Sequence, residues 1–261
     1  MLMTRWVSAD QKKSIRHWAM EFVIVVAGVL LALWLQQWGE RQRALSDMKA
    51  AEEAIHDELR TALQAIMWRK AISQCHIDRQ ELLKSMLLKG DDWPGLTENA
   101  LAVRSGGPPT VIPSVFSRPL DTLATAAWTS ALATGALAPM DPERFAKLVA
   151  LYDHLETLRR ARDDETAAVA NMSALAFPLH LTPELRAQMI ESVYRVDRSR
   201  FTFGMVSPGD FAASMRELGW DDEHVMDGLI AHDLAETKAQ GFVFRPCVAA
   251  VQNPFRSDQP N

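Results

Sequence analysis

Two groups of residues in this chain have the side-chain types that could bind a metal ion. In the first group, Glu53 and His56 lie three positions apart, which is the spacing used in di-iron helical bundles. At about 100° per residue, however, Glu53 points roughly 160° away from Ile55, which belongs to the apolar face of the same predicted helix. Metal ligands in a bundle must face its core. We therefore interpret Glu53 and His56 as part of a solvated helix face.

The second group lies near the start of the last predicted helix and contains Asp221, His224, Asp227 and His232. The two histidines are eight residues apart, or about 12 Å along a helix, so they cannot bind one ion. Gly228, at the position between them, has no side chain. The chain also lacks a Gly-x-Ser-x-Gly motif, a phosphate loop and a Gly-x-Gly-x-x-Gly motif. We expect no metal, no cofactor and no enzymatic activity.

A charged run in one predicted helix suggests a binding surface, but it has a simpler explanation. The run from Arg159 to Glu165 is rich in charge, yet Arg159 with Asp163 and Arg160 with Asp164 are spaced for pairing within one helix. We interpret this run as a solvated helix face.

Two aromatic residues are candidates for lining a ligand pocket. Trp128 and Tyr152 fall on two predicted helices that face one another, where they could line a pocket or pack in the core. A pocket there is the basis of an alternative function, a small-molecule sensor that signals through a partner protein.

Residues 18–38 form the segment that must position the rest of the chain. An uninterrupted apolar run from Phe22 to Leu35 lies between Trp18 on one side and Trp34 and Trp38 on the other. Twenty-one helical residues span about 30 Å, the thickness of the hydrocarbon core of a bilayer, and tryptophan favours the headgroup layer. No cleavage site with small residues follows. The sequence predicts an uncleaved transmembrane helix over residues 18–38.

Three residues of this segment could contact another membrane helix. Gly28 and Ala32 form a small-x-x-x-small pair, which allows close approach of two helices, although such residues are common in spans. Glu21 lies one turn inside the boundary. It is either an interfacial carboxylate near the N-terminus of its helix or a polar contact to another membrane protein.

The same segment resembles the opening of an uncharacterised family of bacterial single-pass membrane proteins. That family begins with a span that starts at a glutamate and ends in a Gln/Asn-x-Trp-x-Glu motif. The matching residues are Glu21, Gly28, Leu31, Ala32, Leu33, Trp38 and Glu40, whereas Trp34, Gln36 and Gly39 depart from the pattern. A looser patch runs from Ala127 to Tyr152. The family has no established activity, so the resemblance implies an architecture and a bacterial inner membrane location only.

Charge suggests how the chain is oriented. Residues 1–17 form a basic tail of net charge +3, and the remainder carries −8, which argues against a nucleic acid partner. Four basic residues precede the span and three follow it closely, Arg41, Arg43 and Lys49. The positive-inside rule therefore puts the N-terminus in the cytoplasm and the rest of the chain in the periplasm, by a narrow margin.

Residues 40–241 are predicted to form one all-α domain, an antiparallel helical bundle interrupted by a loop at 90–118. A long helix over 40–89, with a blurred apolar stripe near Arg69 and Lys70, continues the span. It is either a bundle helix or a signalling or dimerising stalk. Capping signals predict further helices, which we place at 119–134, 142–174, 182–198, 207–219 and 222–240. Residues 242–261 are expected to be an extended tail.

The two cysteines, Cys75 and Cys247, have two possible states. In an oxidising periplasm they would be the only possible intramolecular disulfide, which would attach the tail to the bundle. Alternatively, Cys75 continues the apolar stripe of its helix as a small buried hydrophobic residue. Taken together, the sequence predicts a non-enzymatic membrane protein whose partners are the lipid bilayer and either another protein or a second copy of itself.

Overall fold

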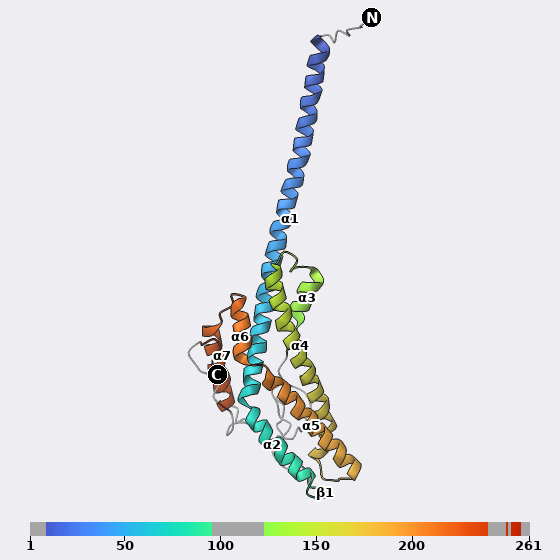
Figure 1. The fold of residues 1–261 in the computed structure, drawn as a ribbon, viewed down its shortest axis with the longest axis vertical. Coiled ribbons are helices and arrows are strands. Elements are labelled where there is room, and N and C mark those ends of the chain that lie inside the picture. Colours follow the sequence, from blue (N-terminus) through green and yellow to red (C-terminus); the bar gives the residue numbers. More distant parts are fainter. Residues whose placement is uncertain (1–8, 96–122, 240–248, 250–251, 257–261) are drawn as a thin grey trace.

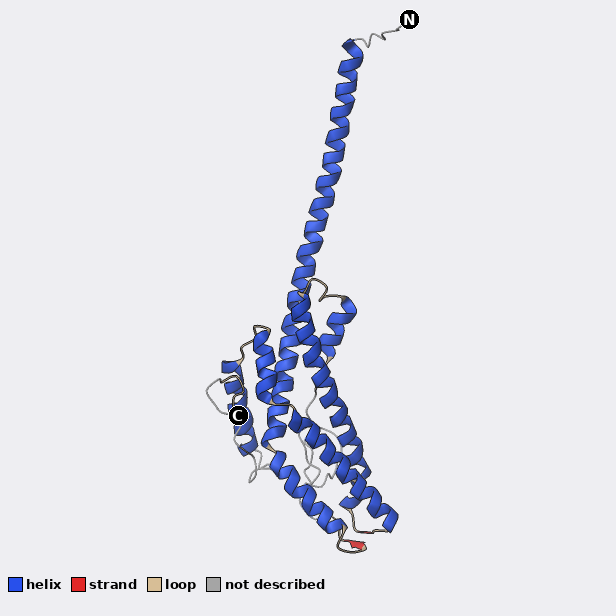
Figure 2. Cartoon of the chain, viewed as in Figure 1, coloured by secondary structure: helices blue, strands red, loops and turns tan. Residues whose placement is uncertain are grey.

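The computed structural model describes residues 9–95, 123–239, 249 and 252–256. Regular structure in this part of the chain is almost entirely helical, with one pair of two-residue strands (Figure 2). The predicted all-α class is confirmed. A rod formed by the first helix leads into a bundle formed by the others (Figure 1).

Helix α1, Ala9–Ala71, contains both the apolar segment and the first helix of the bundle. Its 63 residues correspond to a length of about 95 Å. It is long and apolar enough to cross a membrane, and none of its most apolar 18-residue window is buried by the rest of the protein. The first fully buried core residue is Ile55. The long helix therefore continues from the apolar segment into the core without a break, as predicted.

The helix over 40–89, predicted as one long helix with a possible kink, is divided at Ile72, close to the blurred stripe. Helix α2, Ser73–Leu87, begins after Ile72, whose φ of −98° and ψ of 2° lie outside helical geometry. The backbone amide of Ala249 donates a hydrogen bond of 2.9 Å to the carbonyl of Ala71. A group inserted into a helical hydrogen-bond ladder is a known cause of a bend, and this one ties the C-terminal residues to the division.

Three helices begin where the capping signals predict. They are α4 at Pro142–Asn171, α5 at Pro183–Met205 and α6 at Pro208–Glu217. In each, proline occupies the first helical position, and the side chain before it, from Asp141, Thr182 or Ser207, accepts a hydrogen bond from a backbone amide. Helix α5 runs on to Met205, beyond the predicted end at Arg198. Helix α7 covers Glu223–Ala239.

Two short elements differ from the prediction. Helix α3, Ala126–Thr134, ends at Gly135 with φ 69° as predicted, but residues 123–125 are not helical, so its start is later than the predicted Pro119. Strand β1, Asp92–Trp93, pairs antiparallel with β2, Leu179–His180, after the 3-10 helix η2 at Ser173–Ala176. Strand β1 falls inside the predicted loop 90–118, and β2 falls between the helices predicted at 142–174 and 182–198. Neither was predicted, because a two-residue strand has no recognisable periodicity and its partner lies far away in the sequence.

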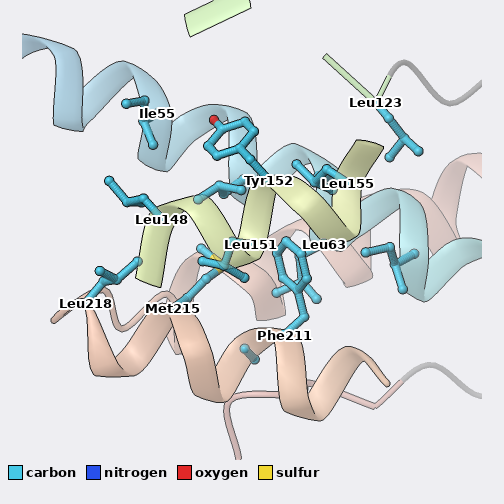
Figure 3. Close-up of a cluster of buried hydrophobic side chains, with 14 of the residues drawn as sticks. Ile55, Leu63, Leu123, Leu148, Leu151, Tyr152, Leu155, Phe211, Met215 and Leu218 are labelled. Atoms are coloured by element: carbon cyan, nitrogen blue, oxygen red, sulfur yellow. The ribbon is translucent and has the colours of Figure 1, made fainter. Parts of the chain in front are cut away.

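The core consists of two clusters of buried side chains. The first joins α1, α3, α4 and α6, with α4 lying between α1 and α6 (Figure 3). It includes an apolar stripe of α4 formed by Leu148, Tyr152, Leu155 and Leu158. The second cluster joins α2, the end of α4 and α5 around residues such as Leu83, Leu87, Met172 and Val193. Thus α1 packs in the first core cluster and α2 packs in the second.

Candidate functional site

Glu58 of α1 accepts hydrogen bonds from two other helices of the first cluster, α3 and α4. Its carboxylate accepts hydrogen bonds from the backbone amides of Ala127 at 2.9 Å and Trp128 at 3.5 Å, and from the Tyr152 hydroxyl at 2.6 Å. These amides belong to the first turn of α3, where Thr125 makes no side-chain cap. Glu58 therefore caps α3 from another helix and bonds α4 at the same time.

Trp128 and Tyr152, the two predicted pocket residues, do lie on facing helices and contact one another. Their rings stack with centroids 4.6 Å apart and an interplanar angle of 10°. Phe145 lies on the other side of the contact, with its centroid 5.7 Å from that of Trp128. Because the two rings are in face-to-face contact, a ligand cannot lie between them in this conformation.

The environment of Tyr152 changes its acidity. Burial in the core, followed by the hydrogen bond to Glu58 and the negative charge of that carboxylate, raises the pKa of Tyr152 well above its ordinary value of 10.0. The hydroxyl is therefore neutral and serves as a donor over the physiological range. It is held as a structural hydrogen-bond donor, and its proton is not available to an incoming base.

His56 belongs to a second polar cluster, which corrects its predicted place on a solvated face. Its Nε2 lies 2.7 Å from Oδ2 of the buried Asp222, and its ring stacks on Trp220 with centroids 4.7 Å apart. Glu53 is exposed, as predicted. Glu53 lies on the side of the helix away from Ile55, as its angular position predicts. His56 lies only about 100° from Ile55 around the helix, so its side chain reaches the segment before α7.

Ion pairs attach α1 to α4 at two levels. Arg144 donates from Nε to Glu52 at 2.6 Å, near the start of α4. Arg69 and Glu165 form a buried pair at 2.8 Å, and the Arg69 guanidinium lies 4.1 Å from the Phe203 ring centroid. On α4, Glu165 of the second pair lies between Leu158 of the first core cluster and Ala168 of the second.

The charged run of α4 is only partly the solvated face that was predicted. Arg159 pairs with Asp163 at 3.3 Å as expected, but Arg160 pairs with Glu156. Asp164 instead bonds Arg195 of α5, and Glu165 bonds Arg69 of α1. The hydrogen bonds from Arg159 and Arg160 lower the pKa of Glu156 to about 2. The run therefore connects three helices as well as facing solvent.

The acidic start of α7 is occupied by contacts within the chain. Asp227 accepts hydrogen bonds from Asn253 at 2.8 Å and Arg256 at 2.7 Å, and these bonds lower the pKa of its carboxyl. Asp221 accepts from the backbone amide of Glu223. Among the residues that the structure describes, no group of three or more His, Cys, Asp or Glu side chains is arranged to hold a metal ion.

The Asp227 contacts also change the description of the tail predicted for 242–261. Phe255 is buried in the first core cluster, and the Arg216 guanidinium lies 6.0 Å from its ring centroid. The described residues 252–256 are thus docked on α6 and α7 and are not a free extension.

The remaining predicted site residues stay untested. Glu21, Gly28 and Ala32 lie on the exposed part of α1, and a Cβ placed on Gly28 would meet nothing within 4 Å beyond the adjacent residues and backbone of its own helix. The proposed disulfide falls outside the described residues, because the position of Cys247 and the side chain of Cys75 are not described.

Sequence reasoning missed Glu58 and Asp222, the two carboxylates around which the polar clusters form. A weak signal for Glu58 was present: it lies three residues after Ile55, about 60° from it, at the edge of the apolar stripe. Both polar clusters join helices to one another, and their acidic groups are bonded to donors of the same chain.

Comparison with family models, curated proteins and solved structures finds no match for this chain.

Proposed function

We propose that this chain is a non-enzymatic, membrane-anchored helical protein that binds another protein, or assembles with itself, at the bacterial inner membrane. The observation that carries this proposal is the apolar segment of α1. It is unburied over its whole 18-residue window, and yet belongs to the helix that supplies Ile55 and Leu59 to the core.

Water is an unfavourable environment for this segment. Exposed side chains such as Phe22, Ile24 and Leu30 form a continuous apolar surface far larger than a soluble monomer tolerates. A bilayer covers a single helix on all sides, and the flanking tryptophans suit its headgroup layers. A lipid environment therefore explains the exposure without a second protein. The charge asymmetry then favours a cytoplasmic N-terminus and a periplasmic bundle.

The binding role is supported by the way in which the anchor joins the bundle. Residues 39–47 of α1 carry no fully buried side chain, so a rigid helical neck holds the bundle away from the membrane. Glu52, Glu58 and Arg69 of the same helix bond to α3 and α4. Such an arrangement suits a protein that holds a binding domain at a fixed distance from the membrane. The polar clusters stabilise the packing of its helices.

The sensor alternative would need a ligand between the helices of Trp128 and Tyr152. The direct stack of these rings favours the core role over that alternative.

Copurification from detergent-solubilised membranes tests the proposal. We expect the full chain to remain in the membrane fraction after alkaline carbonate extraction, and chemical cross-linking before solubilisation to give a discrete larger species. A chain that is extracted by carbonate, or one that remains monomeric without any cross-linked partner, would contradict the proposal.

A further inference from the structure

Helix α5 exposes an apolar seam that neither core cluster covers. Tyr194, Phe201 and Met205 are exposed by 59%, 64% and 71% of their surface. The opposite face of the same helix is buried through residues such as Val193 and Val196. A set of large apolar side chains that remains in water on an otherwise well-packed helix marks an interaction surface.

The spacing of the exposed residues identifies the kind of partner. The seam consists of Ala187, Glu191, Tyr194, Arg198, Phe201 and Met205, which follow one another at intervals of 4, 3, 4, 3 and 4, and all six are exposed. This is the heptad spacing with which one helix packs along another. The seam is about 27 Å long, which is enough for a helix of two to three heptads.

The charges of the seam differ from the other charges of the same helix. Arg186, Arg195, Asp197 and Arg200 all form ion pairs within the chain. In the described part of the chain, Arg198 and Glu191 form no ion pair, although the charge of Glu191 acts on Arg195. Two charges of opposite sign, one heptad apart in the seam, therefore have no direct ion-pair partner among the described residues.

A membrane is not the occupant that this seam fits. Figure 1 shows α5 in the half of the bundle that lies away from the N-terminal part of α1. The Lys84 ammonium, 5.1 Å from the Tyr194 ring centroid and 3.3 Å from Asp197, sets α5 alongside α2 at this end. Lipid held by α1 is at the opposite end of the molecule.

A second copy of the chain fits poorly as well. In a parallel pair of seams, Glu191 would face its own copy and so would Arg198, which places like charges together. In an antiparallel pair, one copy would be reversed. Figure 1 shows α5 oblique to the rod of α1 and not perpendicular to it, so the two anchors of such a pair would not be parallel and could not both follow the normal of one bilayer.

We infer that the seam of α5 docks an amphipathic helix of a different protein, which carries a basic residue at the level of Glu191 and an acidic residue at the level of Arg198. The remaining positions of the partner's seam are apolar and pack against Tyr194, Phe201 and Met205. This inference rests on the proposed function, because it names the surface and chemistry by which the anchored bundle binds its partner.

Three synthetic helical peptides test the inference with the full chain in lipid nanodiscs. Each has three heptads with leucine in the seam, and they differ only at two seam positions one heptad apart, which hold Lys/Glu, Glu/Glu or Lys/Lys. We expect the native chain to bind the Lys/Glu peptide at least about fivefold tighter than the other two, in the orientation that sets its lysine against Glu191 and its glutamate against Arg198. Glu191→Lys should shift the preference to Glu/Glu, and Arg198→Glu should shift it to Lys/Lys.

The aromatic anchor has its own expectation and control. Phe201→Ala should weaken the binding of all three peptides by about tenfold or more, because aromatic side chains at the centre of an interface dominate the binding energy. Arg160→Glu, an exposed charge reversal on α4, should leave the affinities unchanged. Absence of binding at millimolar peptide, or one ranking of the peptides for all the charge variants, would overturn the inference.

Copurification from membranes separates this inference from the proposed function. A partner retained equally by the native chain and by the Phe201→Ala and Arg198→Glu variants would overturn the seam and leave the proposed function standing. Self-association that these variants abolish would show that a second copy occupies the seam, and would overturn the choice of a different protein. A monomer that retains no partner would contradict the proposed function itself.

Discussion

At the scale of single residues, carboxylates of α1 and of the segment before α7 determine how the helices meet. Glu58 supplies both the cap of α3 and the acceptor for Tyr152, and Asp222 orients His56 against Trp220. None of these contacts joins neighbours in sequence. Each of them joins elements that are far apart in the sequence.

Replacing Glu58 should destabilise the bundle strongly. Glu58→Ala leaves the Tyr152 hydroxyl and two backbone amides without their acceptor, so we expect the free energy of unfolding to fall by about 2–4 kcal/mol. Tyr152→Phe removes only one of these bonds and should cost about 1 kcal/mol. Glu53→Ala is the matched control on the exposed side of α1. Equal midpoints for Glu58→Ala and Glu53→Ala in urea denaturation would contradict the capping role.

Alkaline pH should act through Tyr152. A phenol whose pKa is raised on folding stabilises the native state fully below its unfolded value near 10, and this contribution is lost as pH rises beyond that value. We therefore expect stability to fall above about pH 10 in the native chain, and less so in Tyr152→Phe. In a Tyr194→Phe background, tyrosinate absorbance should appear only with unfolding. Its appearance in the folded protein at pH 10 would contradict the burial and hydrogen bond of Tyr152.

At the scale of elements, locally encoded features were predictable from sequence and non-local ones were not. The starts of α4, α5 and α6 follow from a capping residue and a proline that lie next to one another. The start of α3 was placed too early because its cap, Glu58, is 69 residues away from Ala127. The β1–β2 pair and the His56–Asp222 contact were missed for the same reason. The two candidate pocket residues were predicted on facing helices, but periodicity could not show that their rings stack on one another.

Docking of the C-terminal residues should depend on acid pH. The pKa of Asp227 is lowered from 3.8 by Asn253 and Arg256, so its contribution to stability is present above that value and is lost as pH falls below it. We expect protease cleavage near residue 253 to accelerate below about pH 4 before the bundle unfolds. Asp227→Asn should give the same cleavage at neutral pH, whereas Asp153→Asn, an exposed control on α4, should not. Protection that is unaffected by Asp227→Asn would contradict this docking.

At the scale of the whole molecule, the apolar segment and the bundle share one helix, but only the bundle part of that helix is buried. The apolar window of α1 contributes no residue to the core. Along α1, the first residue that packs against the core is the partly buried Met48, and the first buried member of the core is Ile55. The domain should therefore fold without its anchor.

Deleting residues 1–39 tests this independence. We expect a soluble helical protein that unfolds cooperatively, because every member of the two core clusters is retained. Far-ultraviolet circular dichroism and thermal unfolding provide the measurement, and a deletion of residues 1–60, which removes Ile55, Glu58 and Leu59, provides the contrast. If the shorter deletion were as unfolded as the longer one, the bundle would depend on the membrane segment.

The central claim, that the exposed segment of α1 is surrounded by lipid, can be measured position by position. Single nitroxide labels at each residue from 22 to 35, in a chain with both native cysteines replaced by serine, report collisions with oxygen and with a water-soluble nickel complex in reconstituted vesicles. We predict high oxygen and low nickel accessibility throughout this run, and the reverse at Asp57, which is exposed on the bundle. High nickel accessibility at residues 22–35 would contradict the account.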